Sequence, residues 1–267
     1  MKKKLIILIN IFLFISCQAD VLKENKVVSK NHNYKKQLKE EYGQKGKSYN
    51  YKKQLGKKYM QGEKDRLIFL INSLVELNNK AIDNSFEKFK SEPSNQYNLP
   101  FKNVSWATLN KTLADDIEES KMARRCLYAV LDYNERELQE LGLILNSNVY
   151  CIKKIANKIM QNAGIEFQFR FEAIMRLLLA KKNNLMLLDI SDLKGIKICI
   201  ENFLALRTTF RKCVKQLLND YSRNKESIKS ENSKLKDYLN KTFSNVLLSM
   251  DRDPINLEQE IRNIIVI

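Results

Sequence analysis

Apolar residues recur at every third or fourth position over most of the chain, which is the spacing of amphipathic helices. The first long run predicts a helix from about residue 64 to residue 90, and Pro93 and Pro100 then indicate a loop. Three shorter helices are predicted next, at about residues 105–120, 122–132 and 132–145. Ser105 can serve as the N-cap of the first of these.

A longer helix is predicted at about residues 152–178, where the helical spacing continues without a break. Within it, FQFRF places Phe167 and Phe171 on one helical face and Phe169 on another. The helix is therefore expected to bury two faces, as helices at the centre of a bundle do.

The last third of the chain predicts two helices, at about residues 196–221 and 232–249. Ser191 or Asp192 can cap the first of them, and Arg207 occupies one of its inward positions. Residues 251–267 are expected to form a C-terminal tail, whose closing IIVI run is too short to indicate a strand. The expected fold class is all-α, a bundle of about five to seven helices in a domain spanning residues 64–250.

The start of the chain has the pattern of an export signal. Three lysines precede an apolar run that is too short to span a bilayer as a stable helix. The run ends in FISC, which resembles a relaxed bacterial lipoprotein box, with the small Ser16 before the cysteine and Phe14 where leucine is more usual. Residues 1–16 are therefore expected to be a lipoprotein signal peptide and Cys17 the lipidated first residue of the mature chain. An ordinary cleavable signal with an incidental cysteine is the alternative.

Positive charge is concentrated in the N-terminal part of the chain. The net charge is +16, and the segment Cys17–Arg66 alone holds 14 basic and 6 acidic residues. NYKKQLKEEY at 33–42 recurs there as NYKKQLGKKY at 50–59. Because this segment has few large aliphatic residues, we expect residues 17–63 to be a basic, disordered tether with a short duplication. The duplication could also bind polyanions such as glycosaminoglycans, nucleic acid or acidic lipids.

The sequence offers little chemistry for catalysis. Its one histidine, His32, falls in the predicted tether, and it carries no glycine-rich phosphate loop, H-E-x-x-H motif or C-x-x-C pair. Four acidic residues are better explained as a solvated helix face than as a cation site, namely Asp115, Asp116, Glu118 and Glu119. Neither an enzyme nor a cofactor or metal is expected.

Four cysteines remain after Cys17, and they are Cys126, Cys151, Cys199 and Cys213. Cys199 and Cys213 lie on one predicted helix, about 21 Å apart by helical rise, so they cannot bridge each other. The apolar surroundings favour buried thiols, and a Cys126–Cys151 link is the least implausible disulfide.

Three segments resemble a known family: CLYAVLDYNERELQEL (126–141), IKKIANKIMQNAGIEFQFRFEAI (152–174), and the pattern from LDISDLKGIK to VKQLLNDY. With the leader and the basic arm, they look like Borrelia outer-surface lipoproteins of paralogous family fifty-four, which includes complement-regulator-acquiring surface proteins. The resemblance covers about residues 64–245. It implies an all-helical domain with a long C-terminal helix, displayed on the bacterial surface.

The resemblance also implies a class of partners. Some members bind complement regulators such as factor H, often as dimers through the C-terminal helix, and others bind plasminogen or further host proteins. Ligand binding diverges between members, so no contact residue carries over. The chain extends past the last expected helix with DPINLEQEIRNIIVI (253–267). The dimer geometry of those members is therefore not expected to carry over to this chain.

Together these patterns predict a lipid-anchored, surface-exposed protein of the bacterial outer membrane that contacts host factors and aids immune evasion. Its expected partners are membrane lipid, through acylated Cys17, and a host protein such as factor H or plasminogen, with a homodimer as a further candidate. One alternative is a structural lipoprotein of the envelope. Another is an adhesin whose basic arm binds glycosaminoglycans. Nucleic acid is not an expected partner, because the chain carries an export signal and its charge lies in the arm.

Overall fold

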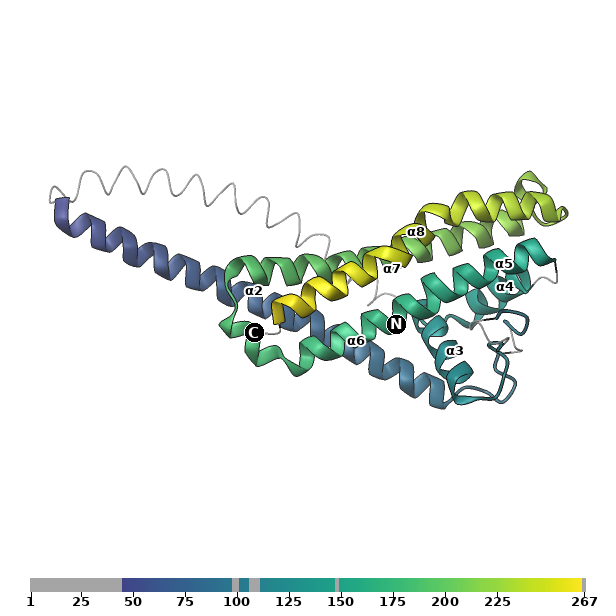
Figure 1. Ribbon diagram of the computed structural model, residues 1–267, viewed down its shortest axis with the longest axis horizontal. Coiled ribbons are helices and arrows are strands. Elements are labelled where there is room, and N and C mark those ends of the chain that lie inside the picture. Colours follow the sequence, from purple (N-terminus) through teal and green to yellow (C-terminus); the bar gives the residue numbers. More distant parts are fainter. Residues whose placement is uncertain (1–44, 98–100, 106–110, 147–148, 266–267) are drawn as a thin grey trace, which may run out of the picture. The chain divides into compact units, whose positions relative to one another are not determined.

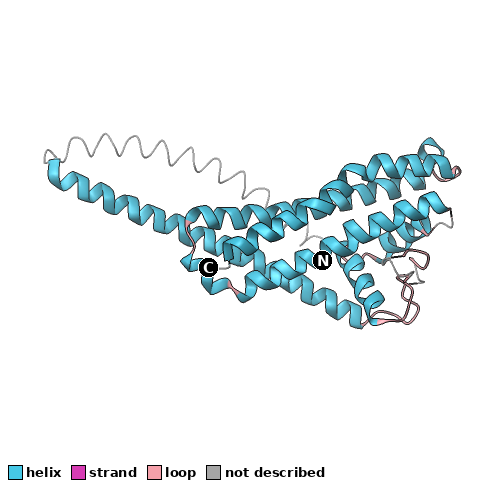
Figure 2. Ribbon diagram, viewed as in Figure 1, coloured by secondary structure: helices cyan, strands magenta, loops and turns pink. Residues whose placement is uncertain are grey.

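The computed structural model describes residues 45–97, 101–105, 111–146 and 149–265, and of residues 45–55 it describes the backbone alone. The chain divides into two compact units, Met1–Gly62 and Glu63–Ile267. In the described part of the first unit, the backbone belongs to helix α2 (Lys45–Lys90), which continues into the second unit. The described residues contain helices and loops and no strand, so the all-α prediction is confirmed (Figure 2).

The early start of α2 corrects the predicted tether of residues 17–63. Residues 17–44 lie outside the described residues, but 45–63 are helical. No proline interrupts this stretch, and it extends a helix that is already nucleated by its packed C-terminal half. Gly56 and Gly62 have low helix propensity, but both are exposed, so neither leaves a gap in the core.

The helix predicted at 105–120 is wrong at residues 111–117, which are not helical, while 106–110 lie outside the described residues. Ser105 forms an isolated antiparallel bridge with Thr112, and helix α3 (Glu118–Val130) begins only after a turn. The Asp115 carboxylate accepts hydrogen bonds from the Thr112 backbone N–H and hydroxyl, at 2.7 and 2.9 Å. These local side-chain bonds compete with helix formation. Helix α4 (Glu135–Leu145) follows, and its N-cap is Asn134, whose side chain accepts from the Glu137 N–H.

The helix predicted at 152–178 is present as one continuous rod of α5 (Tyr150–Lys158), the π-helix η1 (Ile159–Glu166) and α6 (Phe167–Ala180). The sequence did not predict the π-helical segment. At Gly164 an added Cβ would lie 2.6 Å from Leu127 Cδ1, so glycine allows α3 to pack closely on η1. Phe167 and Phe171 are stacked in the core, whereas Phe169 is 60% exposed and contributes to no buried face. The rod nevertheless packs against both α3 and α8, as expected for a helix at the centre of a bundle.

Helix α7 (Ile190–Ser222) follows the short 3-10 helix η2 (Lys182–Leu187). Its N-cap is Asp189, which accepts from the Asp192 N–H, rather than Ser191 or Asp192 as predicted. A turn containing the 3-10 helix η3 (Lys225–Ser227) reverses the chain. Helix α8 (Asn232–Ile265) then returns along α7, and the two lie side by side (Figure 1).

The predicted C-terminal tail is also wrong, because α8 continues through Pro254 to Ile265. Residues 266–267 lie outside the described residues. The buried stripe of α8 continues at Met250, Leu257, Ile261 and Ile265, and this packing outweighs the hydrogen bond that Pro254 cannot donate. Within the described part of the chain, none of the helices has an apolar stretch long enough to cross a bilayer.

Candidate interaction surfaces

Several residues singled out in the sequence lie outside the described residues. They include Cys17, His32 and the first copy of the duplication at 33–42. The second copy, at 50–59, lies in α2, where Lys57, Lys58 and Tyr59 are exposed. The assignments of the leader, the lipidation site and the arm therefore stay predictions.

All four later cysteines are free, and no Cys126–Cys151 link is formed. Cys126 and Cys199 are buried, and burial raises the pKa of each thiol to about 12. Such thiols stay protonated at neutral pH and act as small apolar groups. Cys151 and Cys213 are half-buried.

The acidic cluster does not converge on a common point. Asp115 binds Thr112, whereas the Asp116 carboxylate pairs with Lys121 at 2.7 Å. Glu119 lies 3.9 Å from Lys111. Among the residues described, no group of three or more potential metal ligands comes together.

A buried ion pair joins three helices at the centre of the bundle. Arg125 of α3 donates to both carboxylate oxygens of Glu172 on α6, at 2.9 and 2.6 Å. It also donates to Ser85 Oγ on α2, at 3.2 Å, and its guanidinium lies over the ring of Phe86, 4.0 Å from the centroid. Gln168 donates a further bond to Glu172 at 2.7 Å. The pair satisfies its charges internally, so it positions helices rather than binding a ligand.

Arg124, the neighbouring residue on α3, anchors the loop that follows α2. It donates to both carboxylate oxygens of Glu92 at 3.1 and 3.0 Å and to the Leu113 carbonyl at 2.6 Å. Neither arginine was predicted from the sequence to be buried, although two adjacent charges within the apolar run MARRCLYAV indicate that buried partners exist.

The turn between α3 and α4 is fixed to α7 through Asp132, which has a positive φ of 56°. Arg207 donates to the Asp132 carboxylate at 2.7 Å and to the Ala129 carbonyl at 2.6 Å, and Arg211 pairs with the other carboxylate oxygen of Asp132. The predicted inward position of Arg207 is therefore one that binds this turn.

A shallow surface groove of about 420 Å³ lies between α7 and α8. Ala205, Leu206 and Leu257 contribute apolar surface, and the other lining residues are polar: Asn202, Thr209, Asp253 and Asn256. The lining offers no nucleophile paired with a base and no cluster of metal ligands. Its chemistry suits contact with a side chain of another molecule rather than a reaction.

Comparison with known proteins adds a family assignment to this geometry. The sequence model of a family described as "Borrelia Bbcrasp-1 domain containing protein" matches residues 87–266, about two thirds of the chain. No protein with curated function matches. The predicted resemblance is thereby confirmed.

Solved structures share the fold. The protein BSE31 of Borrelia (Borreliella) spielmanii is 27% identical, with a TM-score of 0.63 over 76% of this chain and 99% of that chain. The outer surface lipoprotein BBA64 of Borrelia burgdorferi is 22% identical, with a TM-score of 0.68 over 76% and 98%. The membrane attack complex assembly inhibitor BGA71 of Borreliella bavariensis is 16% identical, with a TM-score of 0.51 over 66% and 95%.

Proposed function

Because this chain belongs to the Borrelia family of Bbcrasp-1 domain-containing proteins, we propose that it is a lipid-anchored outer-surface protein that binds a host protein of the complement system. The observation that carries the proposal is the family match over residues 87–266. The name of BGA71, a membrane attack complex assembly inhibitor, supports complement as the host system.

The geometry of the described domain suits protein recognition. Buried ion pairs fix α2, α3 and α6 to one another, and the Asp132 contacts fix α7 to the α3–α4 turn. A surface that is held rigid before binding loses less conformational entropy on complex formation. The α7–α8 groove is lined by both apolar and polar side chains, a mixture that protein-binding surfaces share.

The anchor is tested by metabolic labelling of bacteria with a palmitate analogue. We expect label on the wild-type chain and none on Cys17→Ala, because the thiol of residue 17 is the proposed acylation site. Cys151→Ala is the matched control and should keep the label, since Cys151 lies within the folded domain. Labelling of the Cys17→Ala variant would contradict the anchor.

Exposure is tested by treating intact cells with protease. A surface protein loses its helical domain under conditions in which a periplasmic marker stays intact. Full protection would instead favour the alternative of a structural envelope lipoprotein.

The partner is tested by surface plasmon resonance of the purified mature chain against factor H, plasminogen and the terminal complement components, together with lysis of erythrocytes by the membrane attack complex. We expect saturable binding to at least one complement protein. Absence of binding to every complement component, with no change in lysis, would overturn the complement assignment while leaving the surface location to the protease experiment.

A further inference from the structure

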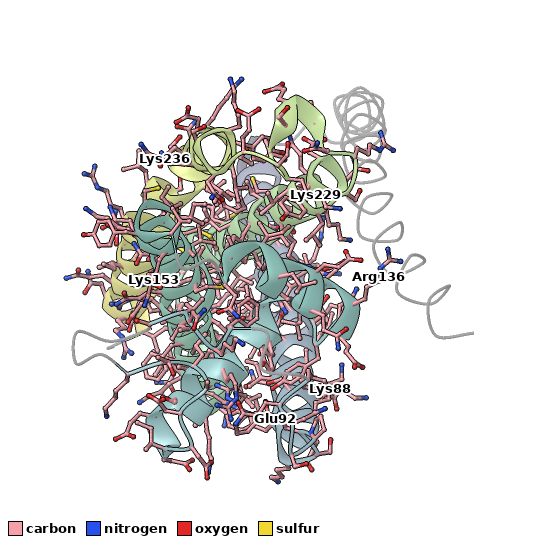
Figure 3. All side chains as sticks on the ribbon, turned by 90° about the vertical axis from the view of Figure 1, so that its right-hand side faces the viewer. Lys88, Glu92, Arg136, Lys153, Lys229 and Lys236 are labelled. Carbon is pink, nitrogen blue, oxygen red and sulfur yellow. The ribbon has the colours of Figure 1, made fainter. Side chains whose placement is uncertain are left out.

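Lysines gather where helix α5 packs against the N-terminal half of α8. We call this surface the lysine face, and it consists of Lys153, Lys154, Lys158, Lys234, Lys236 and Lys241. Lys153 is half-buried and the other five are exposed. In Figure 3, Lys153 and Lys236 both project on the left-hand side of the view. Residues 150–158 include no acidic residue, and 232–249 include only Asp237, so the six lysines leave a net charge of +5.

The charges of the lysine face are not neutralised by the protein. Within the described residues, no ion pair joins any of the six lysines to a carboxylate. By contrast, two lysines outside the lysine face have acidic partners: Lys225 pairs with Asp220 at 3.3 Å, and Lys215 lies 3.9 Å from Glu137. Six like charges without partners repel one another, and an anionic ligand would relieve that repulsion.

The lysine face is elongated, because α5 and α8 run in the same direction and its lysines are spread along both helices. Asn162 donates to Asp251 at 3.3 Å, and Arg170 donates to Glu258 at 2.8 Å. The partners in these two pairs are 89 and 88 residues apart in the sequence, so a step forward along the α5–η1–α6 rod matches an equal step forward along α8. The rod and α8 therefore run in the same direction. Extended backwards, this register places α5 beside about residues 238–247 of α8. The lysines from Lys234 to Lys158 therefore span about 20 Å along the helices, by helical rise.

We propose that the lysine face binds a linear sulfated polysaccharide of the host surface. An extended series of exposed point charges matches a polymer that carries an anionic group at each repeat, whereas a single phosphate would need converging donors. The exposed apolar residues near these lysines, Tyr150 and Leu248, are single side chains and not the continuous stripe that insertion into a membrane surface would require. Tyr150, 79% exposed, lies one turn before Lys154 and extends this face with an aromatic ring.

This proposal rests on the surface location in the proposed function, because only an exposed protein meets host polysaccharide. It differs from the glycosaminoglycan-binding arm predicted from the sequence, since the lysine face belongs to the folded domain. The binding experiment below uses purified protein and the protease experiment uses cells, so the two can fail independently.

The test measures binding of residues 18–267, the mature chain without its lipidated cysteine, to immobilised heparin by surface plasmon resonance. The variant Lys154→Glu/Lys158→Glu/Lys236→Glu changes the lysine face. The control, Lys80→Glu/Lys181→Glu/Lys182→Glu, makes the same charge change at exposed lysines elsewhere in the domain and keeps the basic arm. Circular dichroism and thermal unfolding confirm that both variants are folded.

We expect the lysine-face variant to raise the Kd for heparin at least about tenfold and to lower the slope of log K against log salt by about 2 to 3, because three contacts are lost. The control should change the Kd less than about threefold. Chemically desulfated heparin should bind much more weakly than heparin. Equal losses in both variants, or binding that disappears only on deletion of residues 18–44, would overturn the proposal. A duplex DNA that binds as tightly as heparin would also overturn it, by showing a nonspecific polyanion surface.

Discussion

Arg125 is the side chain through which three helices of the domain are most directly connected. It is 1% exposed and carries a permanent charge, so it must be paired where it lies. Its bidentate bond to Glu172 supplies the opposite charge, and Ser85 and the Phe86 ring occupy its remaining surroundings. Replacing one partner would leave the other buried and uncompensated, which costs far more than an exposed pair contributes.

We therefore predict that Glu172→Gln, which keeps the shape and removes the charge, lowers the free energy of unfolding by about 3 to 5 kcal/mol. The exposed Arg136–Glu140 pair on α4, at 2.7 Å, provides the control, and Glu140→Gln should cost no more than about 0.5 kcal/mol. Urea denaturation followed by circular dichroism measures both. Similar losses in the two variants would mean that Arg125 finds other compensation.

The length of helix α8 determines how far the packed bundle extends along the chain. The sequence predicted its end near residue 249, and Pro254 lies shortly after that point. In the structure the stripe of Leu257, Ile261 and Ile265 stays buried beyond the proline, and an added Cβ at Gly195 of α7 would lie 3.3 Å from Ile264 Cδ1. This close approach indicates that the last turns of α8 are part of the core.

Ile261→Ala should accordingly lower the free energy of unfolding by about 2 to 5 kcal/mol, the usual cost of truncating a fully buried aliphatic side chain. Ile255→Ala makes the same change on the same helix at a residue that is 44% exposed, so its effect should stay below about 1 kcal/mol. Chemical denaturation of the two variants gives the comparison. Equally small effects would indicate that this segment is a tail, as predicted from the sequence.

Prediction from the sequence succeeded where apolar spacing alone determines the element. The regions of α3, α4, α7 and the long rod were found because three-to-four spacing marks a helix wherever one face is buried. Prediction failed where a few local hydrogen bonds, or a contact between residues distant in the sequence, determine the local structure. The Thr112–Asp115 bonds end a helical pattern, and Gly164 allows Leu127 to pack closely on the π-helix, yet neither can be read from spacing. The lysine face escaped notice because its lysines come from segments about 80 residues apart.

At the scale of the whole molecule, the boundary at Glu63 separates the folded domain from what precedes it. Among the described residues, the buried core begins at Leu67 and ends at Ile265. The described side chains at 56–62 of α2 are all exposed, and none of them belongs to the buried core. An unpacked helical extension contributes little to stability in water.

A chain of residues 63–267 is therefore predicted to unfold in one cooperative step, with a free energy of unfolding within about 1 kcal/mol of that of residues 18–267. Parallel urea titrations monitored by circular dichroism measure the difference. A loss of several kcal/mol would show that the N-terminal unit packs on the domain and would move the boundary upstream. The shorter chain contains the whole lysine face and lacks the basic arm. If it is as stable as predicted, it should still bind heparin, and the substitutions at Lys154, Lys158 and Lys236 should still weaken that binding.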